Sequence, residues 1–172
     1  MKHTSYVAFS LLALIMLVTP ACDWFKKEQK TADVVVVEQP ALYVVDVNPA
    51  DVYADAHIPG AVNLTLEGLE AGTKEWNKKS PVVVYCSGYT CTASHAAAKK
   101  LKELGFEDVA IYPGGIAEWH QLSKENKELF QVEGGAKMPF LQKVVEKVLP
   151  KEDAGKTISA EELAQNLAAK KN

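Results

Sequence analysis

Apolar runs alternate with amphipathic segments through the middle of the chain. Residues 42–47, 81–85 and 109–112 are short and almost wholly apolar, a pattern typical of buried parallel strands. An amphipathic helix is predicted at 92–104, and Gly105 is expected to end it. Because strands alternate with helices, the sequence predicts an α/β fold with a mainly parallel central sheet flanked by helices.

Smaller elements complete this pattern. The predicted ones are a β-branched strand at 34–37, a short helix at 48–54, a turn with a short strand at 57–64, a helix or loop at 65–79, and a helix carrying Ala117, Trp119 and Leu122. The helix at 92–104 is expected to bury one face, made of Ala93, Ala96, Ala97, Leu101 and Leu104.

The pattern changes after Ser123, where a helical C-terminal extension over residues 123–172 is predicted. An amphipathic helix is expected at 139–149, with an apolar side made of Phe140, Leu141, Val144, Val145 and Val148. A polar linker over 151–156 follows. Ser159 is then expected to cap a last helix, with Glu162 three residues later completing a capping box.

The N-terminus reads as a targeting segment outside the fold. Residues 6–18 are almost wholly apolar, which is too short for a membrane span and typical of a signal peptide. The residues Thr19-Pro20-Ala21-Cys22 resemble the lipobox of bacterial lipoproteins, in which cleavage leaves a lipid-modified cysteine. We therefore expect a signal peptide at 1–21 and a lipidated tether at 22–33.

This organisation predicts an exported protein that is lipid-anchored through Cys22 on the periplasmic face of a bacterial membrane. Asp23 favours the inner membrane, because in enterobacterial lipoproteins the residue after the cysteine resembles a retention signal. An ordinary signal peptide cut near Ala21, and an uncleaved anchor, are the alternatives.

The composition of the chain limits the partners it can bind and the chemistry it can perform. The chain has 172 residues, 48% of them hydrophobic, which fits one globular domain, and its net charge is −3. No basic block points to nucleic acid, so a nucleic-acid partner is not expected. All 19 basic residues are lysine, so the chain cannot supply a bidentate guanidinium to an oxyanion.

The loop that follows the strand at 81–85 carries the candidate chemistry. Cys86 comes directly after the strand, and a helix begins six residues later at Thr92. Ligands of open α/β sheets bind at the carboxyl ends of strands, where helix N-termini also favour anions. We therefore expect Cys86 to have a lowered pKa and to be a thiolate near neutral pH. The alternative is that Cys86 is a small buried residue that ends a strand.

Several motifs in this region resemble those of the rhodanese-like family, over residues 34–122. They are Asp46-Val47 with Tyr53, the run from His57 to Asn63, the strand leading into Cys86, the helix and strand with Leu104-Gly105-Phe106 and Val109, and Tyr112-Pro113-Gly114-Gly115 with Trp119.

The resemblance implies a sulfurtransferase that needs no cofactor or metal. Cys86 would accept sulfane sulfur from a small donor, such as thiosulfate or a persulfide, and pass it to a thiol or protein acceptor. The substrate would meet the loop formed by Ser87, Gly88, Tyr89, Thr90 and Cys91, together with the N–H of Thr92. The six-residue length of this loop is typical of the family's sulfurtransferases.

Cys91 is a departure from the family, because arginine is usual at its position. A Cys-x4-Cys loop allows two further reactions. Cys91 could resolve a persulfide on Cys86 and leave a disulfide, or the pair could exchange with other thiols in a redox function. The remaining alternatives are that Cys91 only packs against the helix, and that the whole chain is a non-catalytic binding module.

A metal site of Cys86, Cys91 and His95 has no common zinc spacing, so His95 is expected on the solvent-facing side of its helix. His57 and Trp119 are expected to be structural, and His120 to lie on the surface. Residues 158–167 resemble the family's opening helix, so this helix either packs where that helix would or is an independent, partner-binding tail.

Overall fold

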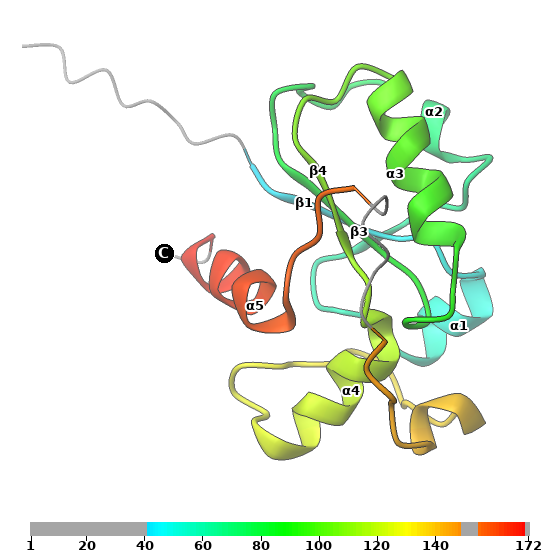
Figure 1. The fold of residues 1–172 in the computed structure, drawn as a ribbon, viewed down its shortest axis with the longest axis vertical. Coiled ribbons are helices and arrows are strands. Elements are labelled where there is room, and N and C mark those ends of the chain that lie inside the picture. The colour runs from blue at the N-terminus through cyan, green and yellow to red at the C-terminus, as the bar shows by residue number, and fades with distance from the viewer. Residues whose placement is uncertain (1–40, 149–154, 171–172) are drawn as a thin grey trace, which may run out of the picture. The chain divides into compact units, whose positions relative to one another are not determined.

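A four-stranded parallel sheet forms the centre of the protein. The computed structural model describes residues 41–148 and 155–170 (Figure 1). The strand order is β2-β1-β3-β4, formed by β1 (Tyr43–Asp46), β2 (Val62–Asn63), β3 (Val82–Tyr85) and β4 (Val109–Tyr112). The predicted α/β fold with a parallel central sheet is confirmed.

Helices cover both faces of this sheet. They are α1 (Ala50–Asp55), α2 (Leu69–Gly72), α3 (Ala93–Glu103), α4 (Gly115–Glu125), the short 3₁₀-helix η1 (Pro139–Gln142) and α5 (Ala160–Ala169). Figure 1 shows α2 and α3 on one side of the strands and α5 on the other. Crossover helices of this kind bury both faces of a parallel sheet, which explains its continuous apolar strands.

Strand β3 shows how the two faces are divided. All four of its residues are buried. Val83 and Tyr85 belong to the hydrophobic cluster on the α4 and α5 side, whereas Val82 and Val84 belong to the cluster on the α3 side. Successive side chains of a strand point to opposite faces, so Cys86, the next residue, continues into the cluster below α3.

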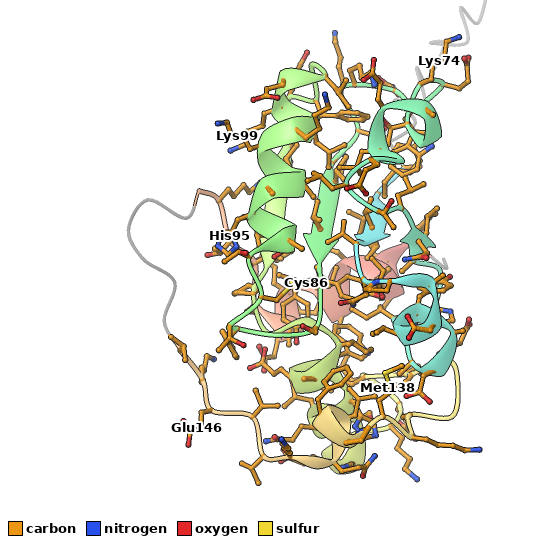
Figure 2. All side chains as sticks on the ribbon, turned by 90° about the vertical axis from the view of Figure 1, so that its right-hand side faces the viewer. Lys74, Cys86, His95, Lys99, Met138 and Glu146 are labelled. Carbon is orange, nitrogen blue, oxygen red and sulfur yellow. The ribbon has the colours of Figure 1, made fainter. Side chains whose placement is uncertain are left out.

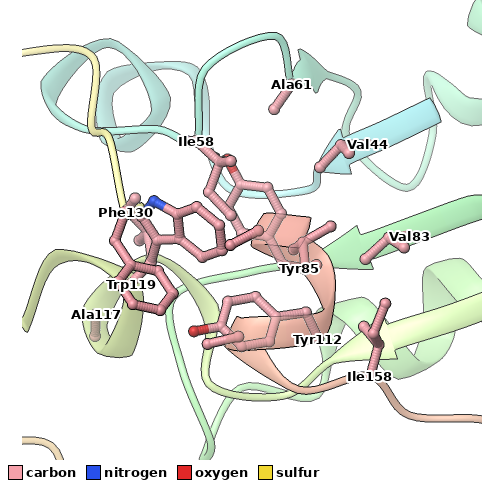
Figure 3. Close-up of a cluster of buried hydrophobic side chains, with 14 of the residues drawn as sticks. Val44, Ile58, Ala61, Val83, Tyr85, Tyr112, Ala117, Trp119, Phe130 and Ile158 are labelled. Atoms are coloured by element: carbon pink, nitrogen blue, oxygen red, sulfur yellow. Dashed lines mark hydrogen bonds between the residues drawn. The ribbon is translucent and has the colours of Figure 1, made fainter. Parts of the chain in front are cut away.

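Aromatic residues fill the core on the α4 and α5 side (Figure 3). The rings of Trp119 and Phe130 meet edge to face with centroids 5.1 Å apart, and those of Tyr112 and Trp119 do so at 5.9 Å. Trp119 Nε1 donates a 2.7 Å hydrogen bond to the Gln131 carbonyl, which satisfies its one polar atom. The expected structural role of Trp119 is confirmed.

Helix α3 buries a face that is rotated from the predicted one. Its buried residues are Ser94, Ala97, Ala98 and Leu101. Ala93 and Ala96 are exposed, so their predicted burial is wrong, and the buried face includes the polar Ser94 instead. Gly105 adopts φ +90° directly after the helix, which confirms the predicted stop.

The C-terminal segment is built into the core. Thr157 pairs in parallel with Ile111 of β4, and Ile158 N–H donates to the Ile111 carbonyl at 2.9 Å. Leu163 of α5 is fully buried in the cluster shared with α4. The predicted cap is present, because Ser159 Oγ accepts the Glu162 N–H at 3.1 Å. The last helix is therefore not an independent tail.

The predicted helix at 139–149 is wrong. Within the described residues 139–148, only the 3₁₀-helix Pro139–Gln142 forms, and Val144 is 84% exposed. An α-helix would pair the Val145 N–H with the Leu141 carbonyl. Instead, Gln121 Oε1 accepts the Val145 N–H at 2.8 Å, and the Leu141 carbonyl lies 3.1 Å from His120 Nδ1. Two side chains of α4 thus take both partners of that helical hydrogen bond.

The same contact corrects the placement of His120. This residue is buried, with 9% of its surface exposed, rather than lying on the surface. A carbonyl can only accept, so Nδ1 carries the proton in its contact with Leu141. His57 holds a structural position as predicted: Nδ1 lies 2.8 Å from the Tyr53 carbonyl and Nε2 lies 3.0 Å from Glu133 Oε2.

The predicted signal peptide, the tether and the strand at 34–37 lie outside the described residues. Within residues 41–148 and 155–170, no helix has the length and apolar character needed to span a membrane.

Candidate active site

The loop of residues 86–92 joins β3 to α3 at the carboxyl edge of the sheet, where Cys86 lies (Figure 2). A tight turn shapes it, because the Cys91 N–H donates to the Gly88 carbonyl at 2.9 Å. Two backbone hydrogen bonds attach the first half of this loop to helix α4. The Ile116 N–H donates to the Cys86 carbonyl at 3.0 Å, and the Ala117 N–H donates to the Ser87 carbonyl at 3.1 Å. The loop therefore lies between two helix N-termini.

Gly115 makes this attachment possible. Its φ is +57°, and a Cβ at this position would lie 2.3 Å from the Cys86 carbonyl oxygen and 2.6 Å from the Gly88 nitrogen. No side chain fits at these distances, and an L-residue would also be strained at this φ. The glycine after Tyr112-Pro113-Gly114 is therefore a requirement of the loop's position.

Cys86 is a buried thiol, with 1% of its surface exposed. Its Sγ lies 3.3 Å from Ser94 Oγ and 3.6 Å from the Cys91 carbonyl oxygen. The hydrogen bond to the Cys91 sulfur and then burial raise the pKa of Cys86 far above its usual value, while Ser94 acts in the opposite direction. The expectation that Cys86 itself has a lowered pKa is wrong.

Cys91 is the more acidic thiol of the pair. Both cysteines are free thiols, and Cys91 is half-buried. The hydrogen bond from the Cys86 thiol, followed by the N–H groups of Ala93 and Ser87, lowers the pKa of Cys91 to about 5. The loop thus forms the expected anion cradle, but the sulfur of Cys91 lies in it. The two cysteines titrate as a coupled pair, and the lower pKa of the pair is about 5.

Tyr89 connects the loop to α4 through a carboxylate. Its hydroxyl donates a 2.8 Å hydrogen bond to Glu118 Oε1, and the Tyr112 hydroxyl donates to Glu118 Oε2 at 3.0 Å. Burial, followed by Glu118, raises the pKa of both tyrosines, with a further contribution from Glu161. Glu118 therefore places a fixed negative charge beside the loop.

The other predicted loop residues surround the two cysteines. Ser87 and Gly88 are half-buried, as Tyr89 is, whereas Thr90 and Thr92 are exposed. Sequence reasoning missed Ser94 and Glu118. Ser94 can be recognised as a polar residue on the buried face of α3, but only when it is known which face of that helix is buried. Glu118 lies 26 residues after the end of the loop at Thr92, so only the packing of α4 brings it there.

No metal-binding group is found within the part of the chain that the structure describes, where no three His, Cys, Asp or Glu residues lie together suitably. Cys86, Cys91 and His95 therefore do not form a three-ligand set. His95 is half-buried rather than fully turned to solvent.

A parallel sheet covered on both faces, with a cysteine loop between a strand and a helix N-terminus, defines the class as an α/β protein with a cysteine at the carboxyl edge of its sheet. Comparison with known proteins specifies the class. The model of the rhodanese-like domain family matches residues 21–122. The chain therefore belongs to the rhodanese-like family, as its motifs predict.

Curated relatives of this chain include proteins named thiosulfate sulfurtransferase GlpE. The one from Coxiella burnetii is 33% identical over 94 residues, which are 53% of this chain and 86% of the relative. The one from Shewanella oneidensis is 34% identical over 84 residues, which are 49% of this chain and 81% of the relative.

Comparison with solved structures gives partial matches. The BH2092 protein from Bacillus halodurans is 35% identical, with a TM-score of 0.47, over 58% of this chain and 66% of that one. A structure described as rhodanese with anions from E. coli is 29% identical, with a TM-score of 0.38, over 44% of this chain and 88% of that one.

Proposed function

We propose that this protein is a sulfurtransferase that carries sulfane sulfur as a persulfide on Cys86. Membership of the rhodanese-like family and relatives named thiosulfate sulfurtransferase support the activity. The single observation that carries the mechanism is the buried Cys86 thiol beside a second free cysteine, Cys91, in one loop at the carboxyl edge of the sheet, with Cys86 Sγ 3.6 Å from the Cys91 carbonyl oxygen.

The pair supplies both a nucleophile and a base for loading. The Cys91 thiolate accepts the proton of Cys86 while the Cys86 sulfur attacks the outer sulfur of a donor R–S–SH. The S–S bond of the donor breaks, and the products are Cys86–S–SH and R–SH. Ser94, with its hydroxyl beside Cys86, positions the attacking sulfur. A thiol acceptor then attacks the outer sulfur of the persulfide, which regenerates the Cys86 thiol.

Cys91 also provides a second outcome for the persulfide. The Cys91 thiolate can attack the inner sulfur on Cys86, which releases hydrosulfide and leaves a Cys86–Cys91 disulfide. An external dithiol reduces that disulfide and returns both cysteines to the thiol state. The same contact between the two cysteines favours thiol–disulfide exchange as the second candidate function.

The cellular location of the protein is also part of this proposal. We place the domain outside the cytoplasmic membrane, tethered by an acylated Cys22, on the lipobox-like residues Thr19-Pro20-Ala21-Cys22 alone. Metabolic labelling with a fatty-acid analogue tests it, because the label should be incorporated in the native chain and absent in Cys22→Ser.

Intact mass spectrometry tests the sulfur chemistry. The measurements use the full chain with Cys22→Ser, so that Cys86 and Cys91 are the only thiols. After incubation with thiosulfate or a persulfide, a species heavier by one sulfur atom should appear. It should be lost on adding cyanide and be absent in Cys86→Ser.

The other outcomes are equally informative. A species lighter by two hydrogens that requires both cysteines would move the assignment to dithiol redox chemistry. A mass that stays unchanged under every treatment would overturn both candidates and favour a binding module.

A further inference from the structure

The sulfur of Cys86 is closed to solvent. Only 1% of the surface of this residue is exposed. Its Sγ lies 3.3 Å from Ser94 Oγ in α3 and 3.6 Å from the Cys91 carbonyl oxygen in the loop. A sulfur donor must come within about 3.5 Å of Sγ before it can react. Part of the structure around Cys86 must therefore move before a donor reaches the thiol.

The first half of the loop is unsuited to that movement. The Cys86 and Ser87 carbonyls accept backbone N–H groups of α4 at 3.0 and 3.1 Å. Gly115 lies so close to the same two residues that a Cβ has no room between them. Displacing this half would break two backbone hydrogen bonds and the packing at the N-terminus of α4.

The second half of the loop, residues 89–91, is attached through a side chain. The Tyr89 hydroxyl donates a 2.8 Å hydrogen bond to Glu118 Oε1 of α4. The three residues range from half-buried to exposed, so solvent lies on their outer side. The Cys91 carbonyl that contacts the Cys86 sulfur belongs to this half. Displacing residues 89–91 would break the hydrogen bond to α4 and take that carbonyl away from the sulfur.

Glu118 is a fixed partner for Tyr89. The hydroxyl of the buried Tyr112 in β4 donates to its other oxygen, Oε2, at 3.0 Å. The carboxylate is folded back over Gly114, where a Cβ would collide with Oε2. A hydrogen bond to a carboxylate that is already held in place is stronger than one between uncharged groups and needs less ordering. The Tyr89 hydroxyl is therefore held at a defined point on α4.

We propose that the hydrogen bond between Tyr89 and Glu118 is a latch that controls the access of sulfur donors to Cys86. The closed latch holds residues 89–91 over the thiol, and its opening uncovers the sulfur. The inference rests on the proposed function, in which a donor must reach Cys86, and it names the residues that regulate this step. Tyr89 and Glu118 are positioning residues, because they act through the loop.

Alkylation of Cys86 by iodoacetamide tests the latch, because it measures access to the sulfur without any sulfur transfer. The full chain carries Cys22→Ser and Cys91→Ser, so that Cys86 is the only thiol and the backbone carbonyl beside it is retained. Intact mass follows the rate, which is divided by the rate of the same chain unfolded in denaturant. The folded chain should react far more slowly than the unfolded one.

Tyr89→Phe should raise the folded rate by roughly tenfold or more, as the loss of one hydrogen bond to a charged group predicts. The rise should be the same at every pH, because opening multiplies the whole pH–rate profile, whereas a changed acidity of Cys86 would shift the profile. Tyr53→Phe is the matched control. It loses a tyrosine hydrogen bond of the same 2.8 Å length, to the Ala61 carbonyl, in which neither partner belongs to the loop. It should leave the rate unaltered.

A double-mutant cycle identifies the partner of the hydroxyl. Glu118→Ala removes the acceptor and should also raise the alkylation rate. In the Glu118→Ala chain, Tyr89→Phe should have no further effect, because both changes break the same contact. Two effects that simply multiply would show that the Tyr89 hydroxyl acts elsewhere and would overturn the latch.

Failure of the latch and failure of the proposed function can be told apart. An alkylation rate that Tyr89→Phe leaves unchanged, or a rise shared by Tyr53→Phe, would overturn the latch while the sulfurtransferase stands. With Cys91 restored, Tyr89→Phe should speed the loading of Cys86 by a small persulfide as it speeds alkylation. Absence of loading by every donor, with alkylation still sensitive to Tyr89→Phe, would overturn the proposed function and the role of the latch in admitting donors.

Discussion

Cys86 Sγ and Ser94 Oγ lie 3.3 Å apart, one at the end of β3 and the other in the first turn of α3. Both residues are buried, so the contact between the hydroxyl and the sulfur is shielded from solvent. When Cys86 loses its proton, the Ser94 hydroxyl can donate to the thiolate. Ser94 is a positioning residue for the reaction, because it acts through the sulfur of Cys86.

Ser94→Ala should therefore slow the loading of Cys86. Removing the hydroxyl raises the pKa of Cys86 further, so we expect a rate loss of roughly tenfold, the equivalent of one hydrogen bond of about 1.4 kcal/mol. The pH–rate profile should shift to higher pH, which a loss of folding alone would not produce. Ser94→Thr retains the hydroxyl and should recover the profile; an unshifted profile in Ser94→Ala would contradict the assigned role.

The stability of the protein should rise with pH through the range in which Cys91 titrates. The pKa of Cys91 is lowered to about 5 in the folded state, below its unfolded value near 9.0. Between these values the unfolded chain binds more protons, so folding becomes more favourable as pH rises. This contribution is fully present above the unfolded pKa and is lost as pH falls through about 5.

Denaturant unfolding at several pH values checks this dependence. Cys91→Ser should flatten the rise in the free energy of unfolding between about pH 5 and pH 8 relative to the parent chain with Cys22→Ser. A slope that is unchanged in Cys91→Ser would show that Cys91 is not the thiolate of the pair.

Gly115→Ala should destabilise the protein and displace the loop. The new Cβ would lie 2.3 Å from the Cys86 carbonyl, in addition to the strain of a positive φ, so we expect a loss of about 3 kcal/mol or more. Gly60→Ala is the matched control, because Gly60 has φ +76° but nothing within 4 Å of the added Cβ. It should cost only about 1 kcal/mol. Equal losses in the two variants would show that the loop tolerates the displacement.

Leu163→Ala should show that α5 belongs to the core. Leu163 is fully buried, so the truncation should lower the free energy of unfolding by about 2–5 kcal/mol. Val144→Ala, at a position 84% exposed, should change it by less than about 0.5 kcal/mol. The comparison is direct, because both residues come from the predicted C-terminal extension. A small loss in Leu163→Ala would mean that the domain is stable without α5.

Local pattern predicted much of the fold and the place of the site. The runs at 42–47, 81–85 and 109–112 each contain a strand of the parallel sheet, because a strand buried on both faces needs continuous apolar residues. Cys86 directly follows the central strand, and chain order alone requires it to lie at the carboxyl edge. The cap at Ser159 was also predicted, since a capping box involves only neighbouring residues.

Contacts between distant segments decided the rest. Residues 143–148 have helical periodicity, but Gln121 and His120 take the hydrogen-bonding partners that a helix would use. The charge of the cysteine pair is another example. Burial and the neighbouring sulfur raise the pKa of Cys86, while N–H groups reach Cys91, and spacing along the chain cannot distinguish these surroundings.

The sequence by itself therefore determined the strands at 42–47, 81–85 and 109–112 with the helix between the last two, the α/β class and the loop with two thiols, because these depend on periodicity and local geometry. Only the tertiary structure decided which thiol is the more acidic, brought Ser94 and Glu118 to the loop, and placed Leu163 in the core. Those properties depend on burial and on partners that are far away in sequence, and folding alone brings them together.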